Sequence, residues 1–195
     1  MSKEDYRMRR IAQLVSSARK VLDIGWADKP NIFLSNDSVT GFDKQDAERP
    51  ENYHRVLCGD AGEMLGILQD ECFDAVIAGE ILEHLKNPLC FLSDCVKLLS
   101  PNGLLIVSTP NPNSPIERFL TLFLSRDYFY AADHVTLYPQ RWLIRVMEIC
   151  GCEDVKLCSG GFPIPGIGLV PFPRPWCYQT IAAGRKAENR NSLLG

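Results

Sequence analysis

Short apolar runs alternate with amphipathic segments along most of the chain. The run that starts at Val21 shows almost no polar alternation before it reaches Gly25. Continuous apolar runs of this length are typical of strands buried on both faces of a parallel sheet. Further strands are predicted at Val39–Phe42, Arg55–Cys58, Phe73–Ala78, Leu104–Ser108, Asp154–Cys158 and Tyr178–Ala183.

Apolar residues recur at helical spacing between these runs. The N-terminal stripe consists of Ile11, Leu14, Val15 and Ala18. Helices are also predicted at Pro30–Asn36 and Ala61–Leu68. A further helix is predicted after an N-cap at Asn87, and its buried stripe consists of Leu92, Cys95, Val96 and Leu99. The last predicted helix runs from Pro139 to a stop at Gly151, with one face made of Trp142, Leu143, Val146 and Ile149. Alternating strands and helices predict an α/β domain with a parallel sheet and crossover helices.

The end of the first strand is the most informative point of the pattern. Asp23 and Gly25 lie at its carboxyl end, where open α/β sheets bind their ligands. Pro30 suits the first turn of a following helix, because its missing N–H would have no partner there. The turn indicates a nucleotide-type cofactor, although by itself it also fits the first strand-turn-helix of any α/β domain.

Composition narrows the function classes. The chain has 195 residues, enough for one domain with a substantial core, and a formal net charge of −3. Its basic residues form no cluster beyond Arg9 and Arg10, so we expect no nucleic-acid partner. The N-terminus lacks a signal-peptide core and no run is long enough to span a bilayer, so we expect a cytoplasmic protein without a transmembrane segment.

The eight cysteines are scattered through predicted strands and helices. Without a secretory context they are expected to be reduced thiols. The closest group, Cys150, Cys152 and Cys158, lacks paired metal-ligand spacing, and no metal site is predicted.

An ordered set of motifs carries a family resemblance. The motifs are VLDIG from Val21, an acid after each of the next two strands (Asp43 and Asp60), FDAVIAGEILEHL from Phe73, LLSPNGLLIVSTPN from Leu98 and DHVTLYPQRWLIRVMEICG from Asp133. In this order the chain resembles the class I S-adenosylmethionine-dependent methyltransferases, in the type 11 or 12-like branch that modifies small molecules and lipids. The resemblance implies an α/β, Rossmann-like doubly wound sheet of seven strands, mostly parallel with the last antiparallel and with helices on both faces. Residues 1–186 are then one domain, and 187–195 a disordered tail.

The resemblance implies S-adenosylmethionine as cofactor. Asp43 lies eighteen positions after Gly25, the spacing at which a carboxylate reaches the ribose hydroxyls. Asp60 would hold the adenine amino group; its alternative role is the N-cap of a helix beginning at Ala61. The predicted cofactor-binding residues are Asp23, Gly25, Trp26, Ala27, Asp43, Lys44, Asp60, Ala61, Gly79 and Glu80.

The turn after the first strand departs from two known patterns. It lacks the GxGxxG that a dinucleotide pyrophosphate needs, which disfavours a nicotinamide enzyme. The methyltransferase family usually carries three alternating glycines here, and this chain has Gly25, Ala27 and Lys29. Either Ala27 adopts a strained left-handed conformation or the loop follows another path. Lys29 either reaches the carboxylate of the cofactor's methionine moiety or stays in solvent.

Methyl transfer from a sulfonium needs mainly alignment, and a hydroxyl acceptor also needs a proton acceptor. His84 and His134 are the predicted catalytic residues, each with a structural alternative. Glu80 lies near the expected position of the methyl donor, although Glu80 and Glu83 would also fit a solvated helix start.

Two apolar segments, residues 111–138 and 160–176, fall in connections where substrate covers are built. A hydrophobic acceptor, a membrane surface or a homodimer interface would each cover them. The first hypothesis is methyl transfer to a small, partly hydrophobic or lipid-like acceptor. The second is a methyltransferase-fold scaffold or partner subunit without turnover.

Overall fold

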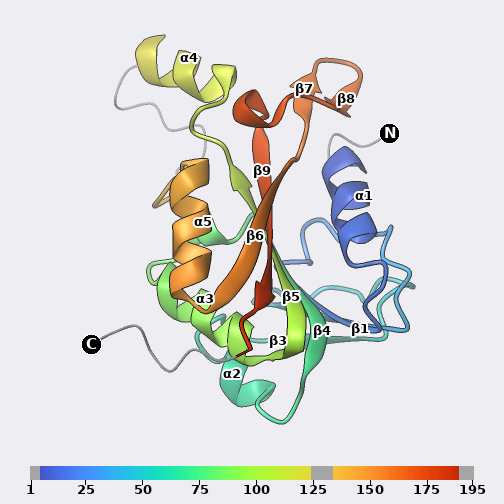
Figure 1. Ribbon diagram of the computed structural model, residues 1–195. Coiled ribbons are helices and arrows are strands. Elements are labelled where there is room, and N and C mark those ends of the chain that lie inside the picture. The colour runs from blue at the N-terminus through green and yellow to red at the C-terminus, as the bar shows by residue number, and fades with distance from the viewer. Residues whose placement is uncertain (1–4, 124–133, 189–195) are drawn as a thin grey trace.

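The computed structural model describes residues 5–123 and 134–188. Its main sheet has seven strands in the order β3-β2-β1-β4-β5-β9-β6 (Figure 1). The strands are β1 (Lys20–Ile24), β2 (Ser38–Asp43), β3 (Arg55–Cys58), β4 (Phe73–Gly79), β5 (Leu99–Pro110), β6 (Cys152–Ser159) and β9 (Gln179–Lys186). Strands β1 to β5 pair in parallel, and β9 runs antiparallel to both β5 and β6. The predicted Rossmann-like α/β sheet is confirmed.

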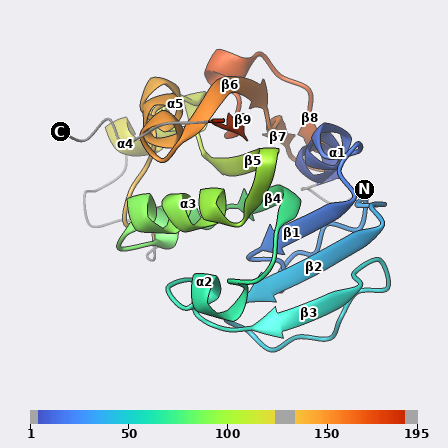
Figure 2. The same ribbon diagram turned by 60° about the horizontal axis from the view of Figure 1, so that its bottom comes forward.

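The helices cover the two faces of the sheet unequally. They are α1 (Asp5–Leu14), α2 (Met64–Ile67), α3 (Pro88–Lys97), α4 (Pro115–Phe123), α5 (Gln140–Ile149) and the short 3-10 turns η1 (Leu82–His84) and η2 (Arg174–Trp176). Alternate strand residues divide between two cores: α2, α3 and α5 pack on one face, and α1 packs with the loops after β1 and β2 on the other. Figure 2 shows α1 apart from α3 and α5 across the sheet.

Chain order reverses between β1 and β4, which lie side by side although two strands separate them in sequence. The connection from β1 leads to β2 on one side, and the connection from β4 leads to β5 on the other. Open sheets of this type leave a crevice at the carboxyl ends of the two central strands. Gly25 and Glu80 directly follow these strand ends.

Each of the seven predicted strands forms, but β5 begins at Leu99 instead of Leu104, so Leu99 belongs to this strand and not to the stripe of α3, which ends at Lys97. The helix predictions were less accurate. No helix forms at Pro30–Asn36, and only Met64–Ile67 of the predicted Ala61–Leu68 is α-helical. The first segment instead makes side-chain contacts: Asn31 Oδ1 accepts from the Phe33 amide at 3.2 Å. Asn52 Nδ2 donates to the carbonyls of Asn31 and Leu34, at 3.0 and 3.1 Å. These contacts use backbone groups that a helix would need.

Helix α5 is rotated relative to the predicted face. Leu143 and Met147 are buried, whereas Trp142 is 65% exposed and Ile149 is 52% exposed. Gly151 ends the helix as predicted, with φ of +99°. The predicted stripe places Trp142 and Ile149 toward the sheet, whereas the structure exposes both side chains to solvent.

The segment 160–176 contains an unpredicted hairpin of β7 (Phe162–Ile164) and β8 (Gly168–Val170). All eight cysteines are free. Of the predicted tail, residues 189–195 lie outside the described part, and the Ala187 amide donates to the Gly151 carbonyl. Among the described residues, no helix combines the length and apolar character needed to cross a membrane.

Candidate functional site

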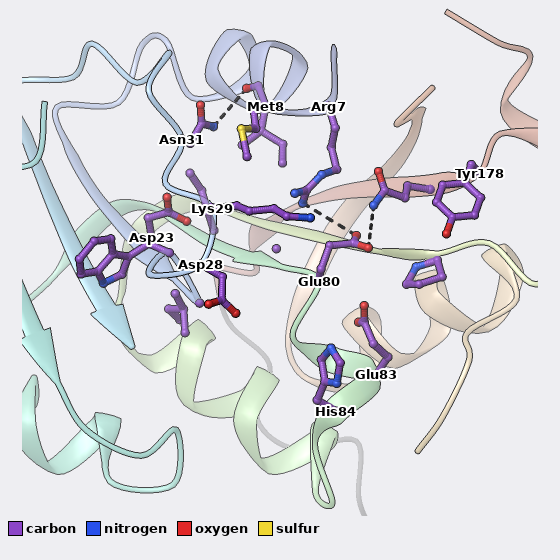
Figure 3. Close-up of a pocket in the computed structure, with 18 of the residues that line it drawn as sticks. Arg7, Met8, Asp23, Asp28, Lys29, Asn31, Glu80, Glu83, His84 and Tyr178 are labelled. Atoms are coloured by element: carbon purple, nitrogen blue, oxygen red, sulfur yellow. Dashed lines mark hydrogen bonds and ion pairs between the residues drawn. The ribbon is translucent and has the colours of Figure 1, made fainter. Parts of the chain in front are cut away.

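Two adjoining cavities open at the carboxyl end of the sheet. The first, of about 370 Å³, lies between α1, the end of β1 and the start of β9 (Figure 3). The second, of about 380 Å³, lies between the ends of β1, β2 and β3. Both are lined by Ile24, Gly25, Asp28, Glu80 and His84. Each has the size of a small-molecule site, and because they share lining residues we treat them together as one candidate site.

Asp43 is the central acid of the second cavity. It ends β2 and is nearly buried, and its two carboxylate oxygens accept from the Ala27 and Gln45 amides, each at 2.9 Å. Each carboxylate oxygen can accept a further hydrogen bond. Asp43 therefore ties the loop after β1 to the loop after β2 and still has lone pairs for a ligand.

Asp60 lies at the outer rim of the same cavity. It is exposed, and its Oδ1 accepts from the Gly62 amide at 2.8 Å. Helix α2 begins only at Met64, with Glu63 as its N-cap, so the alternative of an Asp60 N-cap on a helix at Ala61 is wrong. Phe42, Ile81 and Leu85 add apolar surface to this cavity.

Asp23 lies at the inner end of the first cavity. Its carboxylate is 6% exposed and accepts a hydrogen bond from the Tyr53 hydroxyl. Burial raises the pKa of Asp23 to about 6, while the Tyr53 hydrogen bond and the nearby Arg7 guanidinium act in the opposite direction. The cavity thus contains a carboxyl group that titrates close to neutral pH.

Glu80 connects the two cavities and has a strained backbone, with φ of +54°. Gln179 Nε2 donates to its Oε2 at 2.8 Å, and Arg7 Nη1 lies 3.9 Å from its Oε1. Arg7 also donates to Ser108 Oγ at 2.8 Å, which fixes α1 to β5. Figure 3 shows the Lys29 side chain extending along the first cavity toward Glu80. Charges of both signs therefore line this cavity.

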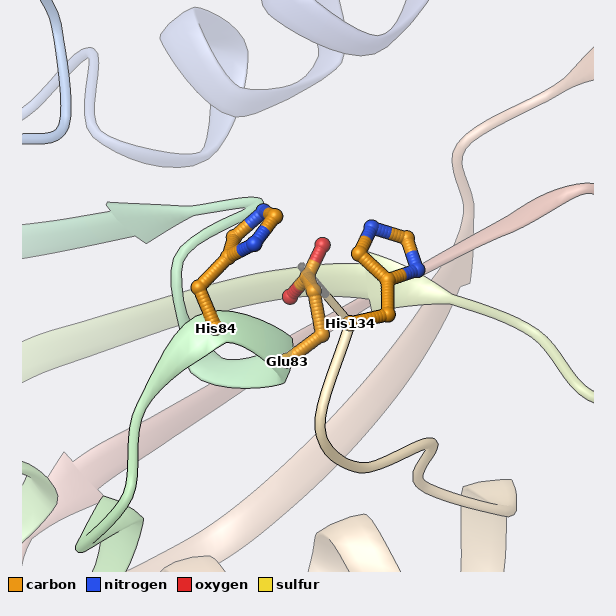
Figure 4. A group of neighbouring side chains, drawn as sticks. All are labelled: Glu83, His84 and His134. Carbon is orange, nitrogen blue, oxygen red and sulfur yellow. The ribbon is translucent and has the colours of Figure 1, made fainter. Parts of the chain in front are cut away.

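Glu83, His84 and His134 gather at the outer end of the first cavity (Figure 4). The two imidazole rings meet edge to face with centroids 4.9 Å apart, and one potential ligand atom from each residue lies within 4.8 Å of the other two. Val135 and Thr136 amides donate to the Glu83 carbonyl, at 2.7 and 3.3 Å. These bonds fix the segment that carries His134 against η1. The set has the donor types of a proton-transfer site or of a divalent-cation site.

Glu83 is 1% exposed, and its Oε2 accepts from Thr109 Oγ1 at 3.3 Å. Burial, together with the neighbouring Glu80 charge, raises the pKa of Glu83 to about 8. The alternative that these two glutamates form a solvated helix start is therefore wrong for Glu83.

The structure brings most of the predicted site residues together. The cavity-lining residues among them are Asp23, Gly25, Trp26, Asp43, Lys44, Asp60, Ala61, Gly79, Glu80, His84 and His134. Ala27 does not line either cavity, although its amide binds Asp43. Residues with positive φ in the described part include Gly25 but not Ala27, so the loop follows another path and Ala27 carries no left-handed strain.

Sequence reasoning missed Arg7, Tyr53 and Gln179. Arg7 belongs to an N-terminal helix, Tyr53 to the connection between β2 and β3, and Gln179 to the start of β9. None follows the carboxyl end of a parallel strand. No local pattern distinguishes Arg7 from the neighbouring Arg9 and Arg10, which a surface helix would equally well expose to solvent.

Comparison with known proteins agrees with this fold. A family model described as "Methyltransferase domain" matches residues 5–157. A ubiquinone biosynthesis O-methyltransferase of Maricaulis maris is 49% identical over 49 residues, which cover 25% of this chain and 19% of that protein. The enzyme of the same name from Photobacterium profundum is 28% identical over 109 residues, covering 49% of this chain and 46% of that protein. The chain thus spans less than half the length of these curated relatives.

Two solved structures share the whole fold. A SAM-dependent methyltransferase from Archaeoglobus fulgidus superposes with a TM-score of 0.72 at 20% identity, covering 95% of each chain. A SAM-dependent methyltransferase from Thermotoga maritima, described as a possible histamine N-methyltransferase, gives 0.74 at 19% identity, covering 93% of this chain and 88% of that one. At these identities the likeness concerns the fold.

Proposed function

The chain belongs to the methyltransferase domain family, and from this we propose that it transfers a methyl group from S-adenosylmethionine to a hydroxyl group on a small acceptor with an apolar part. One observation carries the proposal. The group of Glu83, His84 and His134 lines a cavity that shares Gly25 and Glu80 with the adjoining cavity of Asp43. A methyl donor bound along this crevice would face a proton acceptor.

The second cavity fits the adenosine part of the cofactor. Asp43 offers further lone pairs to the two ribose hydroxyls, and such charge-assisted hydrogen bonds are among the strong ones. Phe42 and Leu85 offer apolar surface to the adenine ring, and Asp60 offers an acceptor for its amino group.

The first cavity fits the methionine part. Its inner half combines the cations Arg7 and Lys29 with the carboxyl groups of Asp23 and Glu80. This charge set matches a zwitterion that carries one carboxylate and one ammonium. The charged and polar side chains that line both cavities therefore suit S-adenosylmethionine in the positions that the structure gives them.

When bound, the cofactor supplies a methyl group that its sulfonium charge has already activated. The protein then has to align the acceptor and accept its proton. We assign proton acceptance to the imidazoles of His84 and His134, because imidazole is the side chain that most often accepts a proton in general acid–base catalysis. The Glu83 carbonyl accepts hydrogen bonds from the Val135 and Thr136 amides and so fixes the segment that carries His134 beside η1.

Two observations support the class of acceptor. The curated relatives are named O-methyltransferases, which favours a hydroxyl acceptor. Exposed apolar side chains also occur in the two apolar segments: Phe119 and Leu122 on α4 are 58% and 71% exposed, and Trp176 of η2 is 55% exposed. The reactive end of the acceptor would then enter the cavity beside His84 and His134, and its apolar part would lie on these side chains.

Cofactor binding is tested by calorimetric titration with S-adenosylhomocysteine. Asp43→Asn should raise the Kd about 10- to 100-fold, since a hydrogen bond to a charged group contributes about 1.5 to 3 kcal/mol. Asp46→Asn is the matched control, because Asp46 is exposed in the same loop and lines neither cavity. Absence of binding by the unmodified protein would favour the scaffold hypothesis instead.

The proton-acceptor role is tested with a panel of phenolic and aliphatic hydroxyl acceptors. His84→Asn and His134→Asn should each lower kcat about 10²-fold or more and leave the Kd of S-adenosylhomocysteine within about twofold. His54→Asn is the control, because His54 is exposed and lies outside both cavities. An unchanged kcat in both site variants would remove the histidines from the mechanism.

The same three side chains also suit a divalent cation, and a chelator separates the two roles. We expect full activity after dialysis against EDTA. Loss of activity that added Mg²⁺ or Zn²⁺ restores would assign the group to metal binding.

A further inference from the structure

Tyr53 lies beneath the first cavity, at the junction of the three segments that form its inner end. Its side chain is 1% exposed. The hydroxyl donates to the Asp23 carboxylate and accepts from the Asn31 amide at 3.1 Å. One buried hydroxyl therefore joins the end of β1 to the loop that follows it.

The aromatic ring of Tyr53 contributes a second contact. It packs against Trp26 with ring centroids 5.5 Å apart and an angle of 43° between the planes. Trp26 in turn lies directly against Gly41, where an added Cβ would come within 2.7 Å of the indole Nε1. The Tyr53 ring thus supports Trp26, the residue after Gly25. On β2, position 41 has no room for a residue larger than glycine next to the Trp26 indole.

Asn31 extends the hydrogen-bonded network to α1. Its Nδ2 donates to the Met8 carbonyl at 3.1 Å, and Asn52 Nδ2 donates to the Asn31 carbonyl at 3.0 Å. Met8, Asn31 and Asp23 all line the first cavity. A loop without the second and third glycines of the family pattern is therefore held by side chains from distant parts of the chain.

The geometry points to Tyr53 as a positioning residue of the cofactor site: its hydroxyl orients the Asp23 carboxylate and seats the loop at Asn31, so that both meet the methionine part of the cofactor. This role rests on the proposed function. Tyr53 itself lines neither cavity and acts through Asp23 and Asn31.

The electrostatics around Asp23 make the role measurable. Arg7 from α1, Asp43 from β2 and Tyr53 face the Asp23 carboxyl, and Asp28, Lys29 and Glu80 line the same cavity. The Tyr53 hydroxyl favours the charged carboxylate, and without it burial would raise the pKa of Asp23 further above about 6. Loss of the hydroxyl should therefore raise the pH below which the Asp23 carboxyl is protonated and loses its negative charge.

The experiment compares the unmodified protein with Tyr53→Phe, which keeps the ring on Trp26 and removes only the hydroxyl. S-adenosylhomocysteine is titrated between pH 5 and 8, and the Asp23 carboxyl is followed by carbon NMR in the ligand-free protein. We expect a Kd about tenfold higher at pH 7 in the variant. The midpoints of the Kd-pH curve and of the Asp23 titration should both move upward by about half a pH unit or more.

Asn52→Ala is the second variant, since Asn52 holds the same loop at Asn31 and Leu34 without touching Asp23. It should weaken binding without moving the Asp23 midpoint. If both variants lost affinity equally and neither midpoint moved, Tyr53 would only pack the loop, and the inference would be wrong. Unchanged binding by Tyr53→Phe would also overturn it. Absence of binding by the unmodified protein would overturn the proposed function, while the carboxyl titration separately tests the Tyr53–Asp23 contact.

Discussion

At the scale of single residues, Glu83 is the group whose burial has the clearest consequence for stability. Its pKa rises from an ordinary 4.5 to about 8 in the folded protein. Between these two pH values the unfolded chain releases the Glu83 proton and the folded protein keeps it. The folded state then binds more protons, so the free energy of unfolding falls as the pH rises through this window.

Glu83→Gln replaces the protonated carboxyl by a group of the same shape that does not titrate. We expect the variant to gain stability relative to the unmodified protein between pH 5 and 8, by roughly 2 to 4 kcal/mol at the upper end. Thermal unfolding at several pH values measures this difference. Glu153→Gln, at an exposed position of β6, is the control, and its stability should depend on pH in the same way as that of the unmodified protein. A constant offset between Glu83→Gln and the unmodified protein across the range would contradict the prediction.

Residues that follow strand ends could be predicted, whereas residues that arrive from elsewhere could not. Asp23, Asp43 and Glu80 were identified because the carboxyl ends of parallel strands meet at one edge of a sheet. Tyr53 and Gln179 reach the site only through the packing of a connection and of an antiparallel strand. Their contacts depend on the tertiary arrangement, which no local pattern encodes.

At the scale of elements, the loop after β1 shows why a missing glycine pattern does not imply strain. Only Gly25 needs a left-handed conformation, with φ of +79°. The Ala27 amide is already used by the Asp43 carboxylate, and Lys29 lines the first cavity. The same local contacts explain the missing helix at Pro30–Asn36, because the pattern of apolar residues gave no sign of the Asn31 and Asn52 side-chain bonds.

From this loop we predict that restoring the glycines will not improve the site. Ala27→Gly relieves no strain and adds freedom to the unbound loop, at a cost of about 0.5 to 1 kcal/mol, so the Kd of S-adenosylhomocysteine should rise about two- to fivefold. Lys29→Gly additionally removes a cation from the cavity and should weaken binding by about tenfold or more. Calorimetry on both variants measures these changes. Tighter binding by either would mean that the present loop restricts the cofactor.

At the scale of the whole molecule, the site is assembled from both halves of the chain. Asn111 Nδ2 donates to the carbonyls of Cys177 and Pro175, at 2.8 and 3.2 Å, so the segment that leads to α4 is joined to η2 beside the start of β9. Pro110, Tyr178 and Gln179 of these same segments line the first cavity. The first apolar segment therefore begins, and the second ends, beside residues that line the first cavity, although residues 124–133 of the first lie outside the described part.

The exposed apolar residues of these segments give the last prediction. On α4, Phe119 packs on Phe123 at a centroid distance of 4.9 Å, yet Phe119, Leu122 and Phe123 remain 58, 71 and 70% exposed. An acceptor that covered such side chains would gain about 1.5 to 3 kcal/mol for each one fully buried. Phe119→Ser with Leu122→Ser should therefore raise KM about tenfold or more for acceptors with a long acyl or prenyl chain. KM for short polar analogues should stay within about twofold.

Sedimentation velocity on the same double variant separates an acceptor surface from an interface between two copies. The acceptor role requires that the variant and the unmodified protein sediment alike while the chain-length dependence of KM is lost. Trp142→Ser is the control, because Trp142 is an exposed apolar residue of α5 that lies outside the two apolar segments. A variant that changes from dimer to monomer and keeps its chain-length dependence would assign these side chains to a homodimer interface. In that case the apolar part of the acceptor would have to be bound elsewhere, and within the first cavity Met8, Ile11 and Ile77 are apolar side chains that could contact it.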